Sequence, residues 1–488
     1  MVQLDLSVLG MMRAPTVALA ALLLGACALA PAPGTDEVVG QALPATTSIP
    51  PAWKSGAGAG AESMARVAAV ADDWLKSLND PPLEAIVAEA IANNLDLRQA
   101  AERVRIAQQT VLVVGAQLLP QVGATLGGRT LHDRDHDGNS NSTIAFASVG
   151  WELDVWGKLR AQRAAAEAGY EATALDYAYA RQSLAATVAR TWYLTIEMRQ
   201  LLALAEQSVT IYSELLKLIK IRRASGRDTD LDVVDMQANV DTALASVEAA
   251  RESYGDIRRA LELLLGRYPA AEIEVTAAYL PLPEPPATGM PAALLERRPD
   301  VVAAERAVLA SFRTLEAAKL ALLPDLSFSL LGGRLGSPLL SLLRLNPWLY
   351  TAAIGVSIPI YEGGALQAQI QIATAQQAQM VARYGQTLLQ AFREVETALA
   401  NEQLLTKRVA QDESALINRT DAVRIATTQY LAGSRDLLWV SNLQTNQIRT
   451  EAELIKVRGL RHLNRIALLL ALGGSFDTVL AATMPQID

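Results

Sequence analysis

Residues 144–156, IAFASVGWELDVW, show most directly how this chain folds. The odd-numbered positions of this stretch are all apolar, whereas four of its even-numbered positions are serine, glycine, glutamate or aspartate. Ile144, Phe146 and Trp156 interrupt the polar face. An alternation with a period of two is typical of a β-strand that has one apolar and one polar face, so we expect a strand here.

Three further segments alternate in the same way: residues 121–129, 325–330 and 351–360. A tilted strand of about 9–11 residues is long enough to cross a bilayer. However, an ordinary sheet that packs on a helix shows the same alternation, and membrane strands give only weak signatures one by one. The four strands therefore fit either a soluble sheet or a membrane sheet until the rest of the chain is considered.

Each pair of strands is followed by a very long run without a helix breaker. No proline occurs in residues 121–268 or 360–484, and both runs are rich in Ala, Leu, Gln, Glu and Arg. They predict helices over residues 157–222 and 363–430, each roughly 100 Å long at 1.5 Å per residue. No window of the mature sequence has the roughly 20 apolar residues of a membrane helix, so we expect these helices to lie in water. A coiled-coil stalk and a curved wall around a conduit both fit their periodicity.

The first residues of the chain are typical of an export signal. Arg13 precedes the apolar run 17–24, and small residues follow it up to Cys27, which is the only cysteine. The apolar run is too short to span a bilayer permanently. Met11 and Met12 are alternative starts of this signal.

Residues 24–27, Leu-Gly-Ala-Cys, resemble the bacterial lipoprotein box. This resemblance implies that residues 1–26 are a signal peptide and that Cys27 carries a lipid, which holds the chain on the outer membrane. A buried free cysteine is the alternative. Residues 27–69 are rich in Pro, Gly, Ala, Ser and Thr, and we expect a lipidated tether without regular structure.

The export signal and the long helices favour the membrane sheet over the soluble one. Four strands cannot close a barrel, because bacterial barrels begin at about eight strands. The edges of a four-stranded sheet would be left unpaired in lipid unless other copies of the chain completed it. Three copies would supply 12 strands, so this interpretation requires a homo-oligomer.

The mature sequence contains two copies of one pattern. Leu118-Leu119-Pro120 returns as Leu322-Leu323-Pro324, 204 residues later, and Gly226 returns as Gly433, 207 residues later. A period of about 200 residues is too long for a solenoid, so we infer the duplication of a half-molecule. The expected organisation is a first repeat over 70–280, a Pro-rich linker over 281–293, a second repeat over 294–475 and a C-terminal tail over 476–488.

Composition excludes several classes of function. The net charge of −8 and the 19% of charged residues indicate neither disorder nor a nucleic-acid interface. One cysteine and three histidines leave little material for disulfide scaffolds, zinc sites or Cys/His catalysis. No phosphate loop, dinucleotide fingerprint or nucleophile–base set is present, so we expect no enzyme and no cofactor apart from the lipid on Cys27.

Residues 133–138, DRDHDG, imitate the beginning of a calcium-binding loop. The twelfth position would be Ile144 instead of the bidentate glutamate that this geometry requires. With His132 and His136 the segment has groups that hold a metal loosely, but a solvated loop between strands is the simpler interpretation. We therefore predict no metal site from the Asp133–Asp137 loop.

Residues 294–301, LLERRPDV, followed by Ala303-Ala304-Glu305, resemble the TolC-like outer-membrane factors of tripartite efflux systems, most closely their lipoprotein (NodT/OprM-like) branch. Residues 94–120 are similar to the first-half counterpart, and the resemblance extends over about residues 70–475. It implies a mainly α fold with a membrane β-barrel portion, in which a trimeric 12-stranded barrel is continued by a long periplasmic α-helical barrel. It also implies docking to a periplasmic adaptor (membrane fusion) protein and coupling to an inner-membrane transporter.

In that family two helical turns close the periplasmic end of the conduit. Tyr430, Gly433 and Arg435 match the pattern of the second turn, which implies that Tyr430 and Arg435 tie neighbouring coils together. The acidic pair that usually follows is absent, since Trp439 and Asn442 occupy its positions. The first turn retains acidic residues after Gly226, namely Asp228, Asp230, Asp232 and Asp235. The plainer alternative is that these acids cap a helix and that the two glycines only form turns.

We therefore expect the outer-membrane channel of an RND-type efflux system, a passive exit duct for drugs or other small molecules. It would be lipid-anchored in the bacterial outer membrane and would have a large periplasmic portion. Metal-ion efflux and type I protein secretion are alternatives that use the same kind of channel. A periplasmic coiled-coil adaptor is a more remote alternative, because an adaptor would lack membrane-compatible strands.

Overall fold

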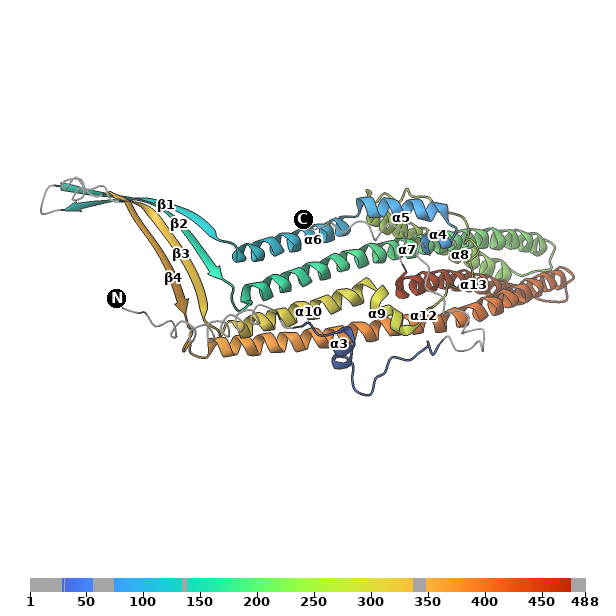
Figure 1. Cartoon of the computed structure of the whole chain (residues 1–488). Helices are drawn as coiled ribbons and strands as arrows, with labels where there is room; N and C mark the ends of the chain where they lie inside the picture. Colours follow the sequence, from blue (N-terminus) through green and yellow to red (C-terminus); the bar gives the residue numbers. More distant parts are fainter. Residues whose placement is uncertain (1–28, 30, 56–73, 134–137, 337–347, 475–488) are drawn as a thin grey trace, which may run out of the picture. The chain divides into compact units, whose positions relative to one another are not determined.

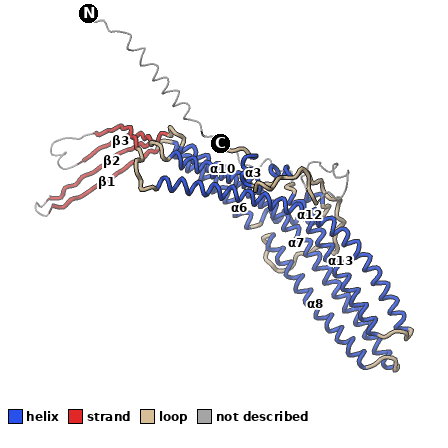
Figure 2. The backbone as a smooth tube through the Cα atoms, turned by 90° about the horizontal axis from the view of Figure 1, so that it is seen from below, coloured by secondary structure: helices blue, strands red, loops and turns tan. Residues whose placement is uncertain are grey.

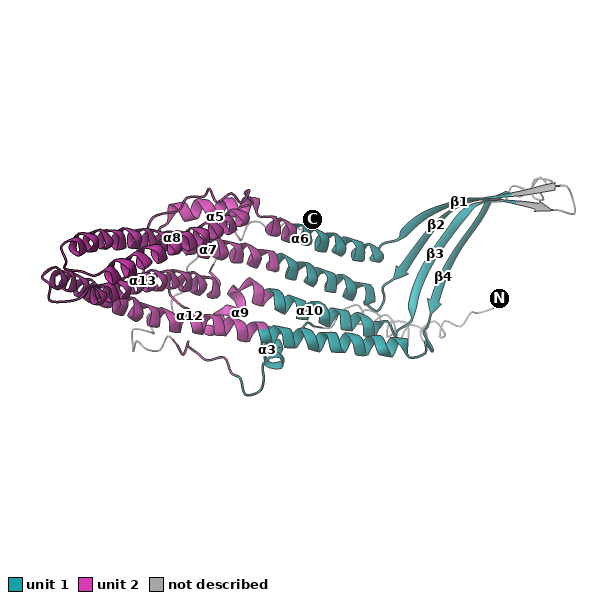
Figure 3. Ribbon diagram, turned by 180° about the vertical axis from the view of Figure 1, so that it is seen from behind, with its two compact units in different colours: residues 1–47, 102–174, 303–386 teal, residues 48–101, 175–302, 387–488 magenta. Residues whose placement is uncertain are grey.

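The computed structural model describes residues 29, 31–55, 74–133, 138–336 and 348–474 (Figure 1). The expected signal peptide, Cys27 and residues 134–137 of the acidic loop lie outside the described residues. The chain divides into two compact units (Figure 3). Unit 1 consists of residues 1–47, 102–174 and 303–386, and unit 2 consists of residues 48–101, 175–302 and 387–488. Each unit contains parts of both repeats.

Unit 1 contains a single antiparallel sheet in the order β1-β2-β3-β4. Its strands are β1 (Gln121–Asp133), β2 (Gly138–Leu153), β3 (Asp325–Gly336) and β4 (Trp348–Ser357). All four predicted strands are present, although β2 begins before residue 144 and ends before Trp156. Within the chain β1 and β4 each pair on one side only, so both are edge strands.

The register of the sheet collects the apolar positions of all four strands on one face. Val122 pairs with Val149, which pairs with Leu330, which pairs with Ala352. Large side chains of all four strands are exposed on this face, among them Val122, Leu330 and Ile354, and Leu126 has an exposed fraction of 83%. A contiguous exposed apolar surface of this kind marks contact with a partner or with lipid.

Phe146 is the exception that the sequence pattern had shown on the polar face. Its cross-strand partner is Gly333, and its ring occupies the space that a side chain at position 333 would need. An aromatic ring that covers a cross-strand glycine stabilises the pairing of the two strands. Phe146 therefore interrupts the polar pattern without reversing the strand.

In chain order the described helices are α3 (Thr35–Ala42), α4 (Trp74–Ser77), α5 (Pro81–Asn93), α6 (Leu95–Gly115), η2 (Ala116–Leu118), α7 (Lys158–Ala224), α8 (Asp230–Leu264), η3 (Pro291–Ala293), α9 (Leu294–Arg297), α10 (Pro299–Leu320), α12 (Ala365–Leu431) and α13 (Leu437–Ala471). Three helices of the first half, α6, α7 and α8, return in the same order in the second half as α10, α12 and α13. The helices α7 and α12 both have 67 residues, and α8 and α13 both have 35. The two long helices are continuous, so neither Gly169 nor Gly385 breaks them.

Equivalent contacts support the internal duplication. In the first repeat Asn94 Nδ2 donates to the carbonyl oxygen of Leu264 at 3.0 Å. In the second repeat Arg298 Nη1 donates to the carbonyl oxygen of Ala471 at 3.3 Å. Asn94 and Arg298 lie at matching positions before α6 and α10, and both acceptors lie at the ends of matching helices. Each half thus joins the residue before α6 or α10 to the end of α8 or α13.

No helix among the described residues combines the length and the apolar character needed to span a membrane.

The core of unit 2 lies where α4 and α5 pack on α7. Trp74 and Leu83 are buried in one apolar cluster with Ala185, Ala189 and Trp192. Asp80, which precedes α5, accepts hydrogen bonds from the backbone N–H of Leu83 and from Trp192 Nε1, both at 3.2 Å. Asp80 thus caps α5 and also fixes it on α7.

The inter-repeat linker is held by α13 through two buried side chains. His462 Nε2 lies 3.0 Å from the carbonyl oxygen of Leu280, and the imidazole stacks on the ring of Tyr279. Arg465 Nη1 donates to the carbonyl oxygen of Pro283 at 2.6 Å, and its Nη2 donates to Glu402. His462 had no assigned role from the sequence, and the structure gives it this structural one.

Glu197 is a buried carboxyl group beside the same linker. Only 7% of Glu197 is exposed, and its carboxylate packs against the backbone of Gly459, where a side chain would have no room. Burial raises the pKa of Glu197 to about 7, although Lys456 acts in the opposite direction. Because an unfolded glutamate ionises near 4.5, ionisation of Glu197 favours the unfolded state. The native protein should therefore lose stability as the pH rises from about 4.5 towards 7.

We predict that Glu197→Gln raises the melting temperature of the purified protein at pH 8 and leaves it unchanged below pH 5. The neutral amide has nearly the shape of the carboxyl group and does not ionise. Glu248→Gln on α8 is the matched control, because the Glu248 side chain is 71% exposed. Thermal unfolding across this pH range measures the effect. Equal shifts for the two variants, or a shift that is independent of pH, would contradict it.

Candidate functional site: the two helical turns

The candidate gate lies in unit 2, at the two turns that join α7 to α8 and α12 to α13 (Figure 2). Gly226 and Gly433 have φ angles of 70° and 78°, a left-handed conformation that glycine adopts without strain. Gly226 N donates to Arg223 O at 2.9 Å, and Gly433 N donates to Tyr430 O at 2.9 Å. Both glycines thus terminate a long helix with the same hydrogen-bond pattern.

Asp232 caps a helix, as the plainer alternative proposed. Thr229 is the N-cap of α8, and its side chain accepts a hydrogen bond from the backbone N–H of Asp232. The Asp232 carboxylate accepts one from the backbone N–H of Thr229 at 2.7 Å in return. Such a reciprocal pair is a capping box. Asp436 caps α13 in a similar way by accepting from the N–H of Trp439 at 2.9 Å.

A buried cluster connects the first turn to α12. Tyr430 donates its hydroxyl hydrogen to Asp228 Oδ2 at 2.5 Å, and Arg222 Nε donates to the same oxygen at 3.0 Å. The Arg222 guanidinium lies 4.4 Å from the centre of the Tyr430 ring. Tyr430 is 1% exposed, and the side chains of Asp228 and Arg222 are 7% and 12% exposed. Residues that are 202 positions apart are thus joined by charge-assisted hydrogen bonds.

The environment of the cluster shifts the pKa values of two of its members. Burial, together with the hydrogen bond to Asp228, raises the pKa of Tyr430. The hydrogen bond to Asp228 raises the pKa of Arg222. Tyr430 and Arg222 therefore keep their protons across the physiological range.

Arg435, which the resemblance pairs with Tyr430 in tying neighbouring coils together, is not part of this cluster. Its guanidinium lies 4.5 Å from the centre of the Trp439 ring, a cation–π contact within its own turn. No carboxylate of the described residues forms an ion pair with Arg435 in this chain. Arg222, which the sequence analysis did not single out, is the partner of Asp228.

The remaining acidic candidates lie at the surface of the first turn. Asp230 forms an ion pair with Arg223 at 2.6 Å, and both side chains are more than half exposed. Exposed pairs of this kind contribute little to stability, about 0–1 kcal/mol. Asp235 is exposed and lies outside the Tyr430 cluster. The structure thus brings together Tyr430 and Asp228 and leaves Asp230, Asp232 and Asp235 apart from them.

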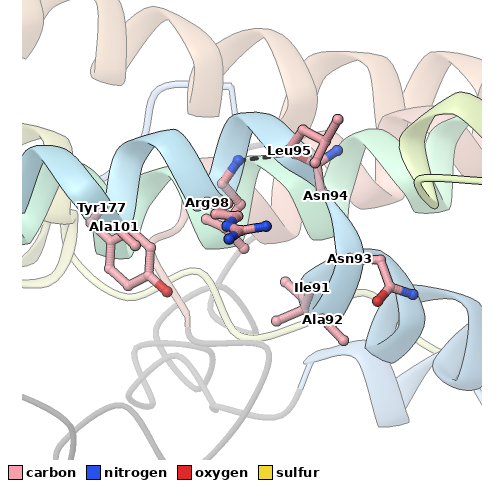
Figure 4. Close-up of a pocket in the computed structure, with 9 residues that line it drawn as sticks. Ile91, Ala92, Asn93, Asn94, Leu95, Arg98, Ala101 and Tyr177 are labelled. Atoms are coloured by element: carbon pink, nitrogen blue, oxygen red, sulfur yellow. Dashed lines mark hydrogen bonds between the residues drawn. The ribbon is translucent and has the colours of Figure 1, made fainter.

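A hollow of about 320 Å³ lies where α5 meets α6, and Figure 4 shows Arg98 and Tyr177 among its lining side chains. Asn94 at this joint is already engaged, because its Oδ1 accepts the backbone N–H groups of Asp96 and Leu97 at 3.0 Å. The hollow therefore lies around the residue that caps α6, and its lining has a structural role. No group of His, Cys, Asp or Glu among the described residues is arranged to hold a metal ion.

Comparison with known proteins identifies the class of protein that has this fold and these turns. The model of the outer membrane efflux protein family matches residues 86–267 and 290–474. The chain belongs to this family. It is an outer-membrane channel protein of efflux systems, and the fold class expected from the sequence is confirmed.

Particular relatives and structures are similar over nearly the whole chain. The pyoverdine export outer membrane protein OpmQ of Pseudomonas putida is 30% identical, over 89% of this chain and 95% of the relative. The toluene efflux pump outer membrane protein TtgC of Pseudomonas putida is 27% identical, over 94% and 95%. The crystal structure of a membrane protein from Pseudomonas aeruginosa has a TM-score of 0.79 at 26% identity, over 92% and 100%. The Campylobacter jejuni CmeC outer membrane channel has a TM-score of 0.80 at 19% identity, over 92% and 96%.

We predict that Tyr430→Phe increases the conductance of the closed protein in planar bilayers by about tenfold. A hydrogen bond to a charged group contributes about 1.5–3 kcal/mol, and about 1.4 kcal/mol corresponds to a factor of ten. Tyr212→Phe is the control, because Tyr212 lies in the same apolar cluster but bonds to the neutral hydroxyl of Thr445. Tyr430 has no gating role if Tyr430→Phe conducts no more than the parent protein and Tyr212→Phe.

Proposed function

We propose that three copies of this chain form a passive duct through the outer membrane. The observation that carries this proposal is the open four-stranded sheet, which has one exposed apolar face and two edge strands. In lipid every backbone N–H and C=O group needs a protein partner, so the edges β1 and β4 must pair with neighbouring copies. Three copies give a closed barrel of 12 strands, and the helices of the three copies continue it as a periplasmic α-barrel.

The N-terminal segment anchors the duct through a lipid on Cys27. Leu29 lies beside Gly157, which follows the end of β2, with its Cδ2 atom 3.3 Å from the position of a Cβ at that glycine. Cys27 precedes Leu29 by two residues in the sequence. One acyl chain gives only marginal binding, so the lipid supplements the barrel.

The two turns are the docking site for a periplasmic adaptor that couples the duct to an inner-membrane transporter. Leu231 and Leu438 occupy matching positions just after the turns, and their exposed fractions are 76% and 60%. Exposed leucines at the end of a helical hairpin suit apolar contact with the helices of a partner. Separation of Tyr430 from Asp228 is the step that opens this end, and Arg435 remains available for contacts with neighbouring copies.

Transport through the duct needs no catalysis, because a wide wetted lumen with a polar wall passes solutes by diffusion. The cargo class is drugs or other small molecules, as for the relatives named for pyoverdine export and toluene efflux. Metal-ion export is the second candidate, because the cation efflux system protein CusC of Escherichia coli is 27% identical over 83% of this chain and 88% of the relative. Type I protein secretion is a further alternative that uses the same kind of duct.

We predict that Ile354→Lys strongly reduces the amount of assembled protein in the outer membrane, whereas Ala353→Lys does not. Ile354 belongs to the apolar face of β4 together with Val356, and Ala353 points to the opposite face. A lysine at the bilayer midplane costs about 2–4 kcal/mol in a barrel, whereas a lysine in the lumen stays in water.

Quantitative immunoblotting of membrane fractions, combined with efflux of a fluorescent dye from whole cells, measures this difference. Equal tolerance of the two lysines would mean that the sheet does not face lipid. A reversed result would mean that the apolar face lines the interior. Either result would remove the basis for the barrel.

A further inference from the structure

The N-terminal segment is packed on the second repeat, contrary to the unstructured tether that its composition predicts. In unit 1, Thr35 at the start of α3 donates to Glu305 on α10 at 2.6 Å. Val38 and Leu43 are buried. The carbonyl group of Ala42 lies against Gly385, where a side chain would have no room.

A second contact, in unit 2, is made by residues 53–55 on α12. The indole Nε1 of Trp53 donates to the carbonyl oxygen of Thr288 in the inter-repeat linker at 3.2 Å, and its ring centre lies 6.3 Å from that of Phe392. The carboxylate of Glu396 accepts the backbone N–H groups of Lys54 and Ser55 at 2.8 and 2.7 Å. We call residues 53–55, with these three partners, the N-terminal clasp.

The clasp combines a buried aromatic side chain with an ionised hydrogen-bond acceptor. Trp53 is only 6% exposed. Burial alone would raise the pKa of Glu396, but the hydrogen bonds from Ser55 and Lys54 outweigh it and lower the pKa. Glu396 is therefore ionised at neutral pH and accepts two charge-assisted hydrogen bonds from the backbone of Lys54 and Ser55.

The duplication shows what the clasp replaces. Phe392 and Glu396 on α12 correspond to Ala185 and Ala189 on α7, each 207 residues earlier. Both alanines are fully buried in the cluster that α4 and α5 form with α7. The second repeat has no helix like α5 before α10, because the helix at that place, α9, has only four residues. The clasp therefore covers the face of α12 that a 13-residue helix covers on α7.

These two coverings differ in strength. The cover of α7 buries Trp74, Leu83 and Val87 almost completely, whereas the clasp holds α12 by one aromatic side chain and two backbone hydrogen bonds. Separation of Tyr430 from Asp228 requires α12 to move relative to the first turn, because Tyr430 lies on α12 and Asp228 belongs to the first repeat. Tyr430 is 34 residues beyond Glu396 on one continuous helix, about 51 Å at 1.5 Å per residue.

We propose that Trp53 and Glu396 are positioning residues that hold α12 in the closed arrangement, and that release of the clasp allows the turns to open. This inference rests on the proposed duct function. It assigns to the N-terminal segment a second task, separate from carrying a lipid.

The test compares Trp53→Ala and Glu396→Ala with Gln403→Ala in the full-length purified protein. Gln403 lies on the same helix but reaches only Ser55 O, at 3.4 Å. Two readouts are measured: closed-state conductance in planar bilayers, and amide hydrogen exchange of residues 425–436. Both clasp variants are expected to raise the conductance about tenfold and to speed exchange in this segment, because Glu396→Ala removes two charge-assisted hydrogen bonds and Trp53→Ala removes a buried ring with its hydrogen bond to Thr288. Gln403→Ala should resemble the parent, and Trp53→Phe, which keeps a ring beside Phe392, should fall in between.

The melting temperature and the hydrogen exchange of the turn together distinguish a clasp that only stabilises the fold from one that positions α12. If the clasp variants melt at lower temperature but leave exchange of residues 425–436 at the parental rate, the positioning role is wrong. If Trp53→Ala adds its full effect to that of Tyr430→Phe, the clasp and the turns are not coupled, which also overturns the proposal. If the parent protein itself forms no channel, the duct function fails, and the exchange measurement still decides whether the clasp acts on the turns.

Discussion

The unpaired edges of the membrane sheet are the constraint on which the rest of the structure depends. Each chain contributes four hydrogen-bonded strands, and their register gives the sheet one apolar and one polar face. A sheet with open edges is not stable in hydrocarbon, because the backbone groups at its edges have no water to bond with. In the proposed trimer, closure by copies of the same chain would satisfy these groups and also create the hole, so assembly and conduction would have one cause.

The two repeats of the chain correspond closely, but they differ at the turns and in the segments that cover their long helices. Asn94 and Arg298 make the same contact at matching joints, which shows how closely the two repeats correspond. The turns do not correspond in the same way, because Asp228 of the first turn binds Tyr430 of the second repeat. The segments that pack on the two long helices differ as well, since the helices α4 and α5 cover α7 and the N-terminal clasp covers α12.

The architecture could be predicted from local patterns in the sequence. Alternation located the four strands, and the absence of proline located α7 and α12 to within a few residues, because both signals reside in neighbouring positions. The partners across the fold could not be predicted in this way. Arg222 binds Asp228 and Tyr430 only after α7 and α12 are packed together, and the pattern match pointed to Arg435. The packing of α3 was missed because α3 has only eight residues, and a helix that short depends on tertiary contacts for its stability. The clasp was missed because its partners lie at least 235 positions away in the sequence.

The mass of the detergent-purified, lipidated protein, measured with a method that separates protein from bound detergent, tests the central claim most directly. The 52.2 kDa chain should be found as a closed particle of three copies. A particle that contains a single chain would contradict the account, because its strands β1 and β4 would then face lipid unpaired.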